Sequence, residues 1–311
     1  MNNQIKKINL KHSFIFFLFC NIFSLIIFKF TNNNISPLLC LLLILIIGVS
    51  HGSLDHEKGK KLFKILNINK IYIFYLFYIL IATLVIVTWI VFPSITLIIF
   101  LIVASYHFGK EDTQFLINNI SYFNQFLFFL KGSLIILAPM FFHFEETVAI
   151  FKLLLVDNEI FYLSLAFVET NKVLPILIVF STLSGVYLFF EEFETKKLII
   201  FLDYFSILML NYYLSPLVAF TIYFCFLHSI RHSISLINEI DNNDFSHGIN
   251  IFIKKALPLT ILTTILCIFG LYLLSNNYGL HSSILKLIFI GLASLTFPHI
   301  LLEYFSEKNE K

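Results

Sequence analysis

Ten apolar runs follow one another along the 311-residue chain, and each is close to the length of a membrane-spanning helix. A helix that crosses the ~30 Å hydrocarbon core of a bilayer needs about 20 apolar residues, and sometimes as few as ~17. Because the runs at 36–50 and 95–109 are short, we expect eight to ten spans in total. The runs lie near 13–30, 36–50, 71–92, 95–109, 122–142, 173–191, 198–214, 215–237, 256–275 and 283–305.

The stretch 147–168 does not fit this series, because Asp157 and Glu159 interrupt it. We expect a peripheral or re-entrant helix there. No soluble domain is left between the runs. The sequence therefore predicts an all-α polytopic membrane protein, a bundle of roughly 8–10 transmembrane helices in which residues 1–311 form a single integral-membrane domain.

Composition supports the same class and excludes others. The chain is 59% hydrophobic and only 13% charged, whereas soluble domains are about half apolar and about a quarter charged. A net charge of +2 offers no basic surface for nucleic acid. The four cysteines lie within apolar runs and form no CxxC pair, so we expect buried small hydrophobic side chains, neither disulfides nor a metal cage.

Lysines indicate the orientation, because short cytoplasmic loops are enriched in Lys and Arg. Ten spans place both termini and all the lysine clusters on the cytoplasmic side of the plasma (inner) membrane, although an error of two spans would give the same result. These clusters are Lys6, Lys7 and Lys11; Lys58, Lys60, Lys61, Lys64 and Lys70; Lys196 and Lys197; and Lys254 and Lys255.

Five histidines lie in or at the ends of apolar runs that all cross from outside to inside: His51, His107, His228, His232 and His299. The topology therefore places imidazoles from four helices at similar depth in the cytoplasmic half of the membrane. Ionisable groups inside a bilayer are costly, about 2.5–3.5 kcal/mol for fully charged residues on insertion scales, and they usually pair. A bound metal is one such partner, and a hydrogen bond to a neighbouring helix is the alternative for any single ring.

The spacing of His228 and His232 favours the metal. Residues four apart are separated by about 40° around a helix, so both rings can address one ion from one face.

Carboxylates accompany three of the histidines. Asp55 follows His51 in GVSHGSLD, Asp112 follows His107 in SYHFGKED, and Glu303 follows His299 in LTFPHILLEY. A carboxylate beside a ligating imidazole accepts the hydrogen of its second nitrogen and fixes the tautomer. We therefore expect Asp55, Asp112 and Glu303 to support ligands, with solvated loop caps as the alternative for Asp55 and Asp112.

Three charged residues inside the runs leave alternatives open. Arg231 faces about 100° away from His232. Its guanidinium can form a salt bridge or reach the cytoplasmic headgroups, and we favour the headgroups. Lys131 and Asp203 are isolated charges that can pair or extend to the interface.

Four motifs carry a resemblance to a known family: GVSHGSLD, SYHFGKED, TIYFCFLHSIRH and LTFPHILLEY. In this order, over about residues 48–304, they resemble the Brp/Blh family of integral-membrane β-carotene 15,15′-dioxygenases. The resemblance implies cleavage of β-carotene at its central double bond with O2 and ferrous iron, Fe(2+), giving two all-trans-retinal for a retinal-consuming rhodopsin. Ser50 is a departure, since the family often has proline there.

The same resemblance implies which residues carry the reaction. The catalytic iron ligands correspond to His51, His107, His228 and His232, whereas His299 is near the site without being a ligand. The competing interpretations are a membrane desaturase or hydroxylase with a di-iron site, a histidine-rich transporter or haem-binding protein, and a non-cleaving accessory factor in retinal production. A di-iron site needs more histidines than the single HxxxH motif found here.

Overall fold

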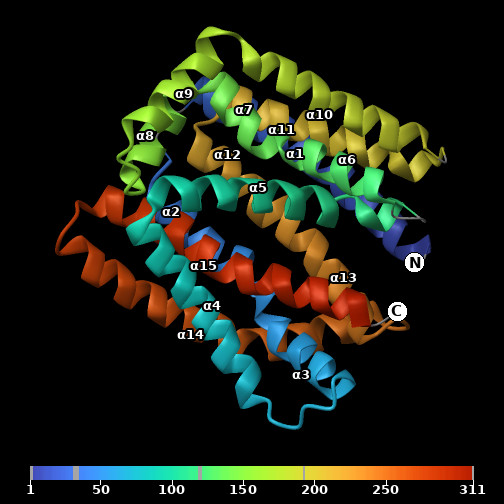
Figure 1. Ribbon diagram of the computed structural model, residues 1–311. Coiled ribbons are helices and arrows are strands. Elements are labelled where there is room, and N and C mark those ends of the chain that lie inside the picture. Colours follow the sequence, from blue (N-terminus) through green and yellow to red (C-terminus); the bar gives the residue numbers. More distant parts are fainter. Residues whose placement is uncertain (1–2, 31–34, 118–120, 192, 310–311) are drawn as a thin grey trace.

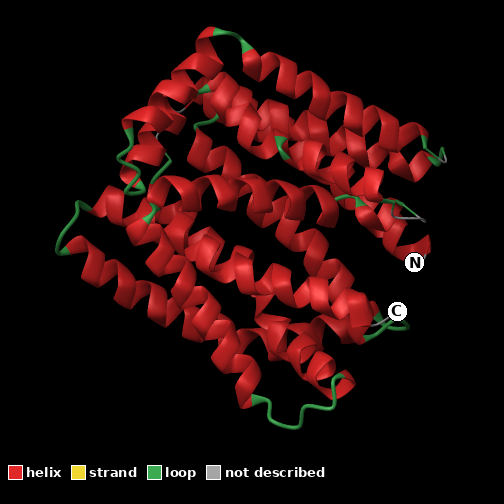
Figure 2. Cartoon of the chain, in the orientation of Figure 1, coloured by secondary structure: helices red, strands yellow, loops and turns green. Residues whose placement is uncertain are grey.

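The computed structural model describes residues 3–30, 35–117, 121–191 and 193–309, and all of their regular structure is helical (Figure 2). The predicted all-α class is confirmed. The elements are α1 (Asn3–Phe30), α2 (Pro37–Leu43), η1 (Ile44–Gly48), η2 (Val49–Leu54), α3 (Asp55–Ile65), α4 (Tyr72–Val91), α5 (Pro93–Glu111), η3 (Gln114–Leu116), α6 (Tyr122–Gly132), α7 (Leu134–Phe142), α8 (Phe144–Leu153), α9 (Glu159–Thr170), α10 (Val173–Phe190), η4 (Thr195–Leu198), α11 (Ile199–Tyr213), α12 (Pro216–Ile222), η5 (Tyr223–Ser229), α13 (Ile230–Ile240), α14 (Phe245–Ser275) and α15 (Leu280–Asn309).

Within the described residues, eight helices are long and apolar enough to cross a membrane, and a bent pair, Pro37–Gly48 with Gly52–Ile65, makes a ninth if it is one span. This agrees with the predicted eight to ten. The predicted run at 198–214 forms α11, whose 15 residues fall short of a full span. The stretch 147–168 falls within two short helices, α8 and α9, with a break between them.

Apolar side chains cover the outside of the bundle, as expected for a surface that faces lipid. In the most apolar 18-residue stretch of α14, none of the residues is buried within the chain. The unit formed by α12, η5 and α13 is the opposite case, because 78% of its most apolar window is buried. The motif with His228 and His232 therefore lies on the central element of the bundle.

Two glycines bring α5 and α6 into backbone contact. A Cβ added at Gly109 would lie 1.8 Å from the carbonyl oxygen of Phe128, and one at Gly132 would lie 1.9 Å from that of Ser105. No side chain fits at either position. Small residues allow close packing between membrane helices, and here they fix the end of α5 that carries His107.

A short turn at residues 241–244 joins α13 to α14. The Oδ1 atom of Asp241 accepts hydrogen bonds from the amides of Asp244 and Asn243, both at 3.0 Å, and its Oδ2 atom lies 2.8 Å from Nδ1 of His247. These contacts, the amide of Asp244 first, lower the pKa of Asp241 to about 2. The charged carboxylate therefore stabilises the turn.

Both described ends of the chain lie at the same edge of the bundle, toward the end of α13 (Figure 1). The short helices α8 and α9 lie at the opposite edge. This arrangement agrees with a topology in which both termini are on one side of the membrane.

Candidate metal site

Three elements bring four histidine rings together inside the bundle. His107 comes from α5, His228 and His232 from the η5–α13 unit, and His299 from α15. Ring centroids are 5.4 Å apart for His107 and His228, 5.5 Å for His107 and His299, and 5.6 Å for His232 and His299. All four are buried. The backbone of His51 lies in η2, but its side chain is outside the described part of the structure.

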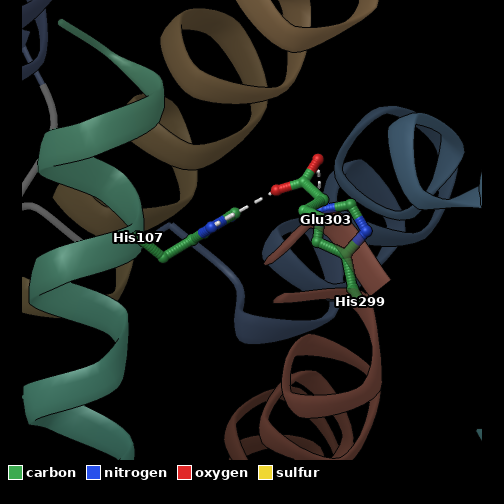
Figure 3. A group of neighbouring side chains, drawn as sticks. All are labelled: His107, His299 and Glu303. Carbon is green, nitrogen blue, oxygen red and sulfur yellow. Dashed lines mark ion pairs between the residues drawn. The ribbon is translucent and has the colours of Figure 1, made fainter. Parts of the chain in front are cut away.

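The carboxylate of Glu303 lies at the centre of this cluster. Its Oε1 atom is 3.5 Å from Nε2 of His299 and 3.6 Å from Nε2 of His232, and its Oε2 atom is 3.8 Å from Nδ1 of His107. Figure 3 shows His107 reaching from α5 toward this carboxylate, with His299 one turn earlier on the same helix as Glu303. Lys58 Nζ donates to Oε1 at 3.0 Å. Glu303 thus contacts three rings and a lysine that come from four helices, α3, α5, α13 and its own α15.

The ring of His299 is oriented by Asp55. Its Nδ1 atom lies 2.8 and 3.0 Å from the two carboxylate oxygens, and the hydroxyl of Tyr78 donates to Asp55 Oδ2 at 2.8 Å. A ring that donates from Nδ1 to a carboxylate turns the lone pair of Nε2 toward the centre, which is how metal-ligating histidines are held. His299 therefore has the arrangement of a ligand.

Two further carboxylates contact the remaining rings. Asp112 Oδ1 lies 3.4 Å from Nδ1 of His228, and Tyr223 donates to Asp112 Oδ2 at 2.6 Å. Glu111 Oε2 lies 3.1 Å from Nδ1 of His232. We expected Asp55, Asp112 and Glu303 each to support the histidine of its own motif. Glu303 lies 3.5 Å from His299 of its own motif, whereas Asp55 and Asp112 contact histidines of other motifs, which lie on helices packed against them.

Arg231 is buried inside the bundle, and the expectation that it reaches the headgroups is wrong. Its guanidinium forms a two-point ion pair with Asp203 of α11, at 2.7 and 3.0 Å, and donates to Ser13 Oγ of α1 at 2.6 Å. It also donates to the carbonyl oxygen of Asp112 at 3.3 Å. The central position of α13 explains this, because a side chain that faces sideways from it meets α1 and α11 before it meets lipid. Arg231 thus ties the segment carrying the histidines to the rest of the bundle.

Two cavities meet at the cluster. The first, here called the apolar cavity, has a volume of about 320 Å³, and α4, α14 and α15 supply most of its apolar lining. It reaches His107, His228 and His299. The second, here called the polar cavity, has a volume of about 360 Å³ and reaches His232, Glu111 and Glu303. The histidine cluster therefore separates a lipid-like space from a polar one.

The donor set fits a non-haem metal. One donor atom from each of His107, His299 and Glu303 lies within 4.8 Å of the others, and the same holds for Glu111, His232 and Glu303. The first group has the two imidazoles and one carboxylate that are typical of non-haem Fe(II) oxygenases, and the second has one imidazole and two carboxylates. Neither group contains a thiolate, the ligand that favours zinc or iron–sulfur clusters.

The fold and this cluster define a class: an all-helical polytopic membrane protein with a buried histidine–carboxylate site suited to a non-haem metal. Comparison with known proteins identifies the family. Residues 42–306 match the family described as "Beta-carotene 15,15'-dioxygenase", and the chain belongs to it. The chain is accordingly an enzyme of the oxygenase class. The matched region is slightly longer at both ends than the stretch of about 48–304 that carries the four motifs.

A relative from an uncultured marine bacterium, 66A03, described as "Beta-carotene 15,15'-dioxygenase", is 31% identical over 277 residues. The matched region covers 84% of this chain and 90% of the relative. No solved structure matches the chain.

Sequence reasoning missed several residues around the cluster. Glu111 had a signal, since it follows His107 by four positions as Glu303 follows His299. Lys58 was assigned only to topology. Tyr78 carried no local signal, because its partner Asp55 is distant in sequence. Asp203 was recognised as an isolated charge, but its partner Arg231 was not identified.

Proposed function

We propose that the chain cleaves β-carotene at the central 15,15′ double bond with O2, giving two molecules of all-trans-retinal. The observation that carries this proposal is the apolar cavity that reaches His107, His228 and His299. Membership of the family supports the choice of substrate.

The proposed cofactor is ferrous iron held by histidines. His107, His228 and His232 keep the role expected from the sequence, and His51 remains the fourth predicted ligand. His299, because Asp55 holds its Nδ1 atom, and Glu303, because its carboxylate lies among the rings, are further candidates. The six groups would not all bind iron at once, since O2 needs an open position. Bound iron would supply the one-electron chemistry that lets triplet O2 react with a closed-shell polyene.

The residues of the chain would bind the hydrocarbon and keep water away from the reacting bond. β-Carotene is a C40 hydrocarbon that partitions into the bilayer, so lateral access is the expected route. The walls of the apolar cavity come from helices that also carry lipid-facing side chains, including Tyr75 of α4 and Leu262 and Leu266 of α14. Substrate would pass between these helices, with its central bond beside His107.

The orientation is part of the same proposal. With both termini on the cytoplasmic side of the plasma membrane, the polar cavity would open toward the cytoplasm. The lysines between the second and third runs are consistent with this.

Expression in bacteria that accumulate β-carotene tests the activity. Cells with the wild-type chain should lose orange colour and yield retinal on extraction, whereas His107→Ala should leave them orange. His143→Ala is the matched control, since His143 lies at the far end of α7, and it should behave as the wild type. Orange cells with wild-type protein in the membrane contradict the proposal. A strong Soret band in the purified protein would favour haem instead.

A further inference from the structure

Different residues line the mouth and the inner end of the polar cavity. Exposed Lys61, Glu239 and Glu307 line the mouth. The inner end is formed by Glu111, His232 and Glu303, whose side chains are 12%, 5% and 9% exposed. A cavity with charged side chains along its lining thus leads from the surface to one side of the histidine cluster.

The three inner residues form a cation-binding arrangement of their own. One donor atom from each lies within 4.8 Å of the others. His232 stands between the two carboxylates, with Nδ1 3.1 Å from Glu111 Oε2 and Nε2 3.6 Å from Glu303 Oε1. Glu303 also belongs to the group with His107 and His299. The two groups are therefore adjacent and share one carboxylate.

The charge of the polar cavity suits a cation. Its lining includes four carboxylates, Glu111, Glu239, Glu303 and Glu307, and two lysines, Lys58 and Lys61. Lys110 lies outside the lining but pairs with Glu307 at 2.7 Å, so one formal negative charge remains in excess. A net negative cleft attracts cations.

The apolar cavity offers no comparable route. Its lining is mostly aromatic and aliphatic, and an ion that sheds its water in such surroundings meets a large desolvation cost. The polar cavity is therefore the less costly route for a divalent cation.

We propose that Glu111, His232 and Glu303 form a loading site, at which a divalent transition-metal cation from the polar cavity binds before Glu303 passes it to His107 and His299. This inference rests on the proposed metal centre but not on β-carotene cleavage. Glu111 is the member that belongs to the loading site alone. In either case His232 stays a ligand of the proposed metal centre; the competing role for Glu111 is to orient the ring of His232 without binding the incoming cation.

Metal exchange distinguishes these roles. Full-length protein in detergent is stripped with a chelator, and Co²⁺ is added as an optical probe. Co²⁺ passes through a loading site both when it enters and when it leaves. Glu111→Gln should therefore slow Co²⁺ uptake and chelator-driven release alike, each on the order of tenfold. The equilibrium affinity for Co²⁺ should then stay within about threefold of the wild-type value. If Glu111 only orients His232, Glu111→Gln should weaken the equilibrium affinity for Co²⁺, because uptake would slow or release would speed up without a matching change in the other rate. The proposal stands only if uptake and release slow together, and any other result overturns it.

Two further variants keep the test decisive. Glu169→Gln removes an exposed carboxylate of α9 outside the cavity and should leave both rates unchanged. If Glu111→Gln does not fold, Glu239→Gln at the mouth decides: it should slow uptake at low salt and lose this effect near 1 M salt, where charges are screened. Unchanged uptake at low salt overturns the proposal.

Wild-type protein that takes up Co²⁺ but does not cleave β-carotene contradicts only the proposed function, whereas wild-type protein that takes up no Co²⁺ contradicts the loading site.

Discussion

Replacement of Asp203 by leucine should strongly destabilise the chain, because it leaves the guanidinium of Arg231 buried without its main counter-charge. Both side chains are 2% exposed or less, and two hydrogen bonds of 2.7 and 3.0 Å join them. Removing one partner of a buried ion pair costs about 3–5 kcal/mol. Ser13 and Asp112 still contact Arg231, so we expect a value near the lower limit.

Thermal unfolding in detergent measures this cost. The single tryptophan, Trp89, is fully buried and its indole N–H donates to the carbonyl oxygen of Leu154 at 2.8 Å, so its fluorescence reports loss of packing. A loss of about 3 kcal/mol corresponds to a decrease in melting temperature of roughly 6–12 °C, at about 2–4 °C per kcal/mol.

A double replacement separates the buried charge from other effects of the substitution. Asp203→Leu combined with Arg231→Met removes both charges, and it should recover most of the lost stability. Lys255→Met is the control, because it breaks an exposed ion pair with Glu57 at 3.3 Å, which is worth about 0–1 kcal/mol. A melting temperature of Asp203→Leu equal to that of the control, or a double variant less stable than Asp203→Leu, would refute the reasoning.

Three further results are expected. Gly109→Ala should lower the melting temperature by several degrees, since its Cβ would lie 1.8 Å from a backbone oxygen of α6. Such overpacking costs about 1–3 kcal/mol or more. Gly291→Ala should leave the melting temperature unchanged, because its Cβ meets nothing within 4 Å. His299→Ala should reduce bound iron, measured by elemental analysis, about 10-fold or more, while His143→Ala should retain it; equal iron content in both contradicts a ligand role. The pKa of Asp241, about 2, is below its unfolded value of about 3.9, so its stabilisation of the turn is present above about pH 4 and is lost as the pH falls toward 2. Pepsin should therefore cut Asp241→Ala faster than wild type at pH 4 but not near pH 2, and a ratio independent of pH contradicts this.

Much of the fold could be predicted because apolar run length is a local property. Runs such as 71–92 and 173–191 correspond closely to α4 and α10. The run 198–214 also matches the bounds of α11, Ile199–Tyr213, but its 15 helical residues are fewer than a full span needs. The tight approach of Gly109 to α6 depends on which helices become neighbours, which no local pattern states.

The candidate site was predictable to a similar degree. Topology placed His107, His228 and His299 at one depth, and the structure brings their rings together. Topology could not show that Asp55 contacts the ring of His299, 244 residues away. Nor could it show that Arg231 turns inward to Asp203. Those pairings are set by rotation of packed helices about their axes, and the charges alone were compatible with lipid headgroups as well.

Product stoichiometry from purified protein tests the central claim most directly. Iron-loaded protein in detergent, supplied with β-carotene and O2, should consume the carotenoid and release two molecules of all-trans-retinal for each one cleaved, as measured by chromatography. The His107→Ala variant should release none. Cleavage products of unequal length, or no loss of β-carotene by protein that retains its iron, would contradict the account.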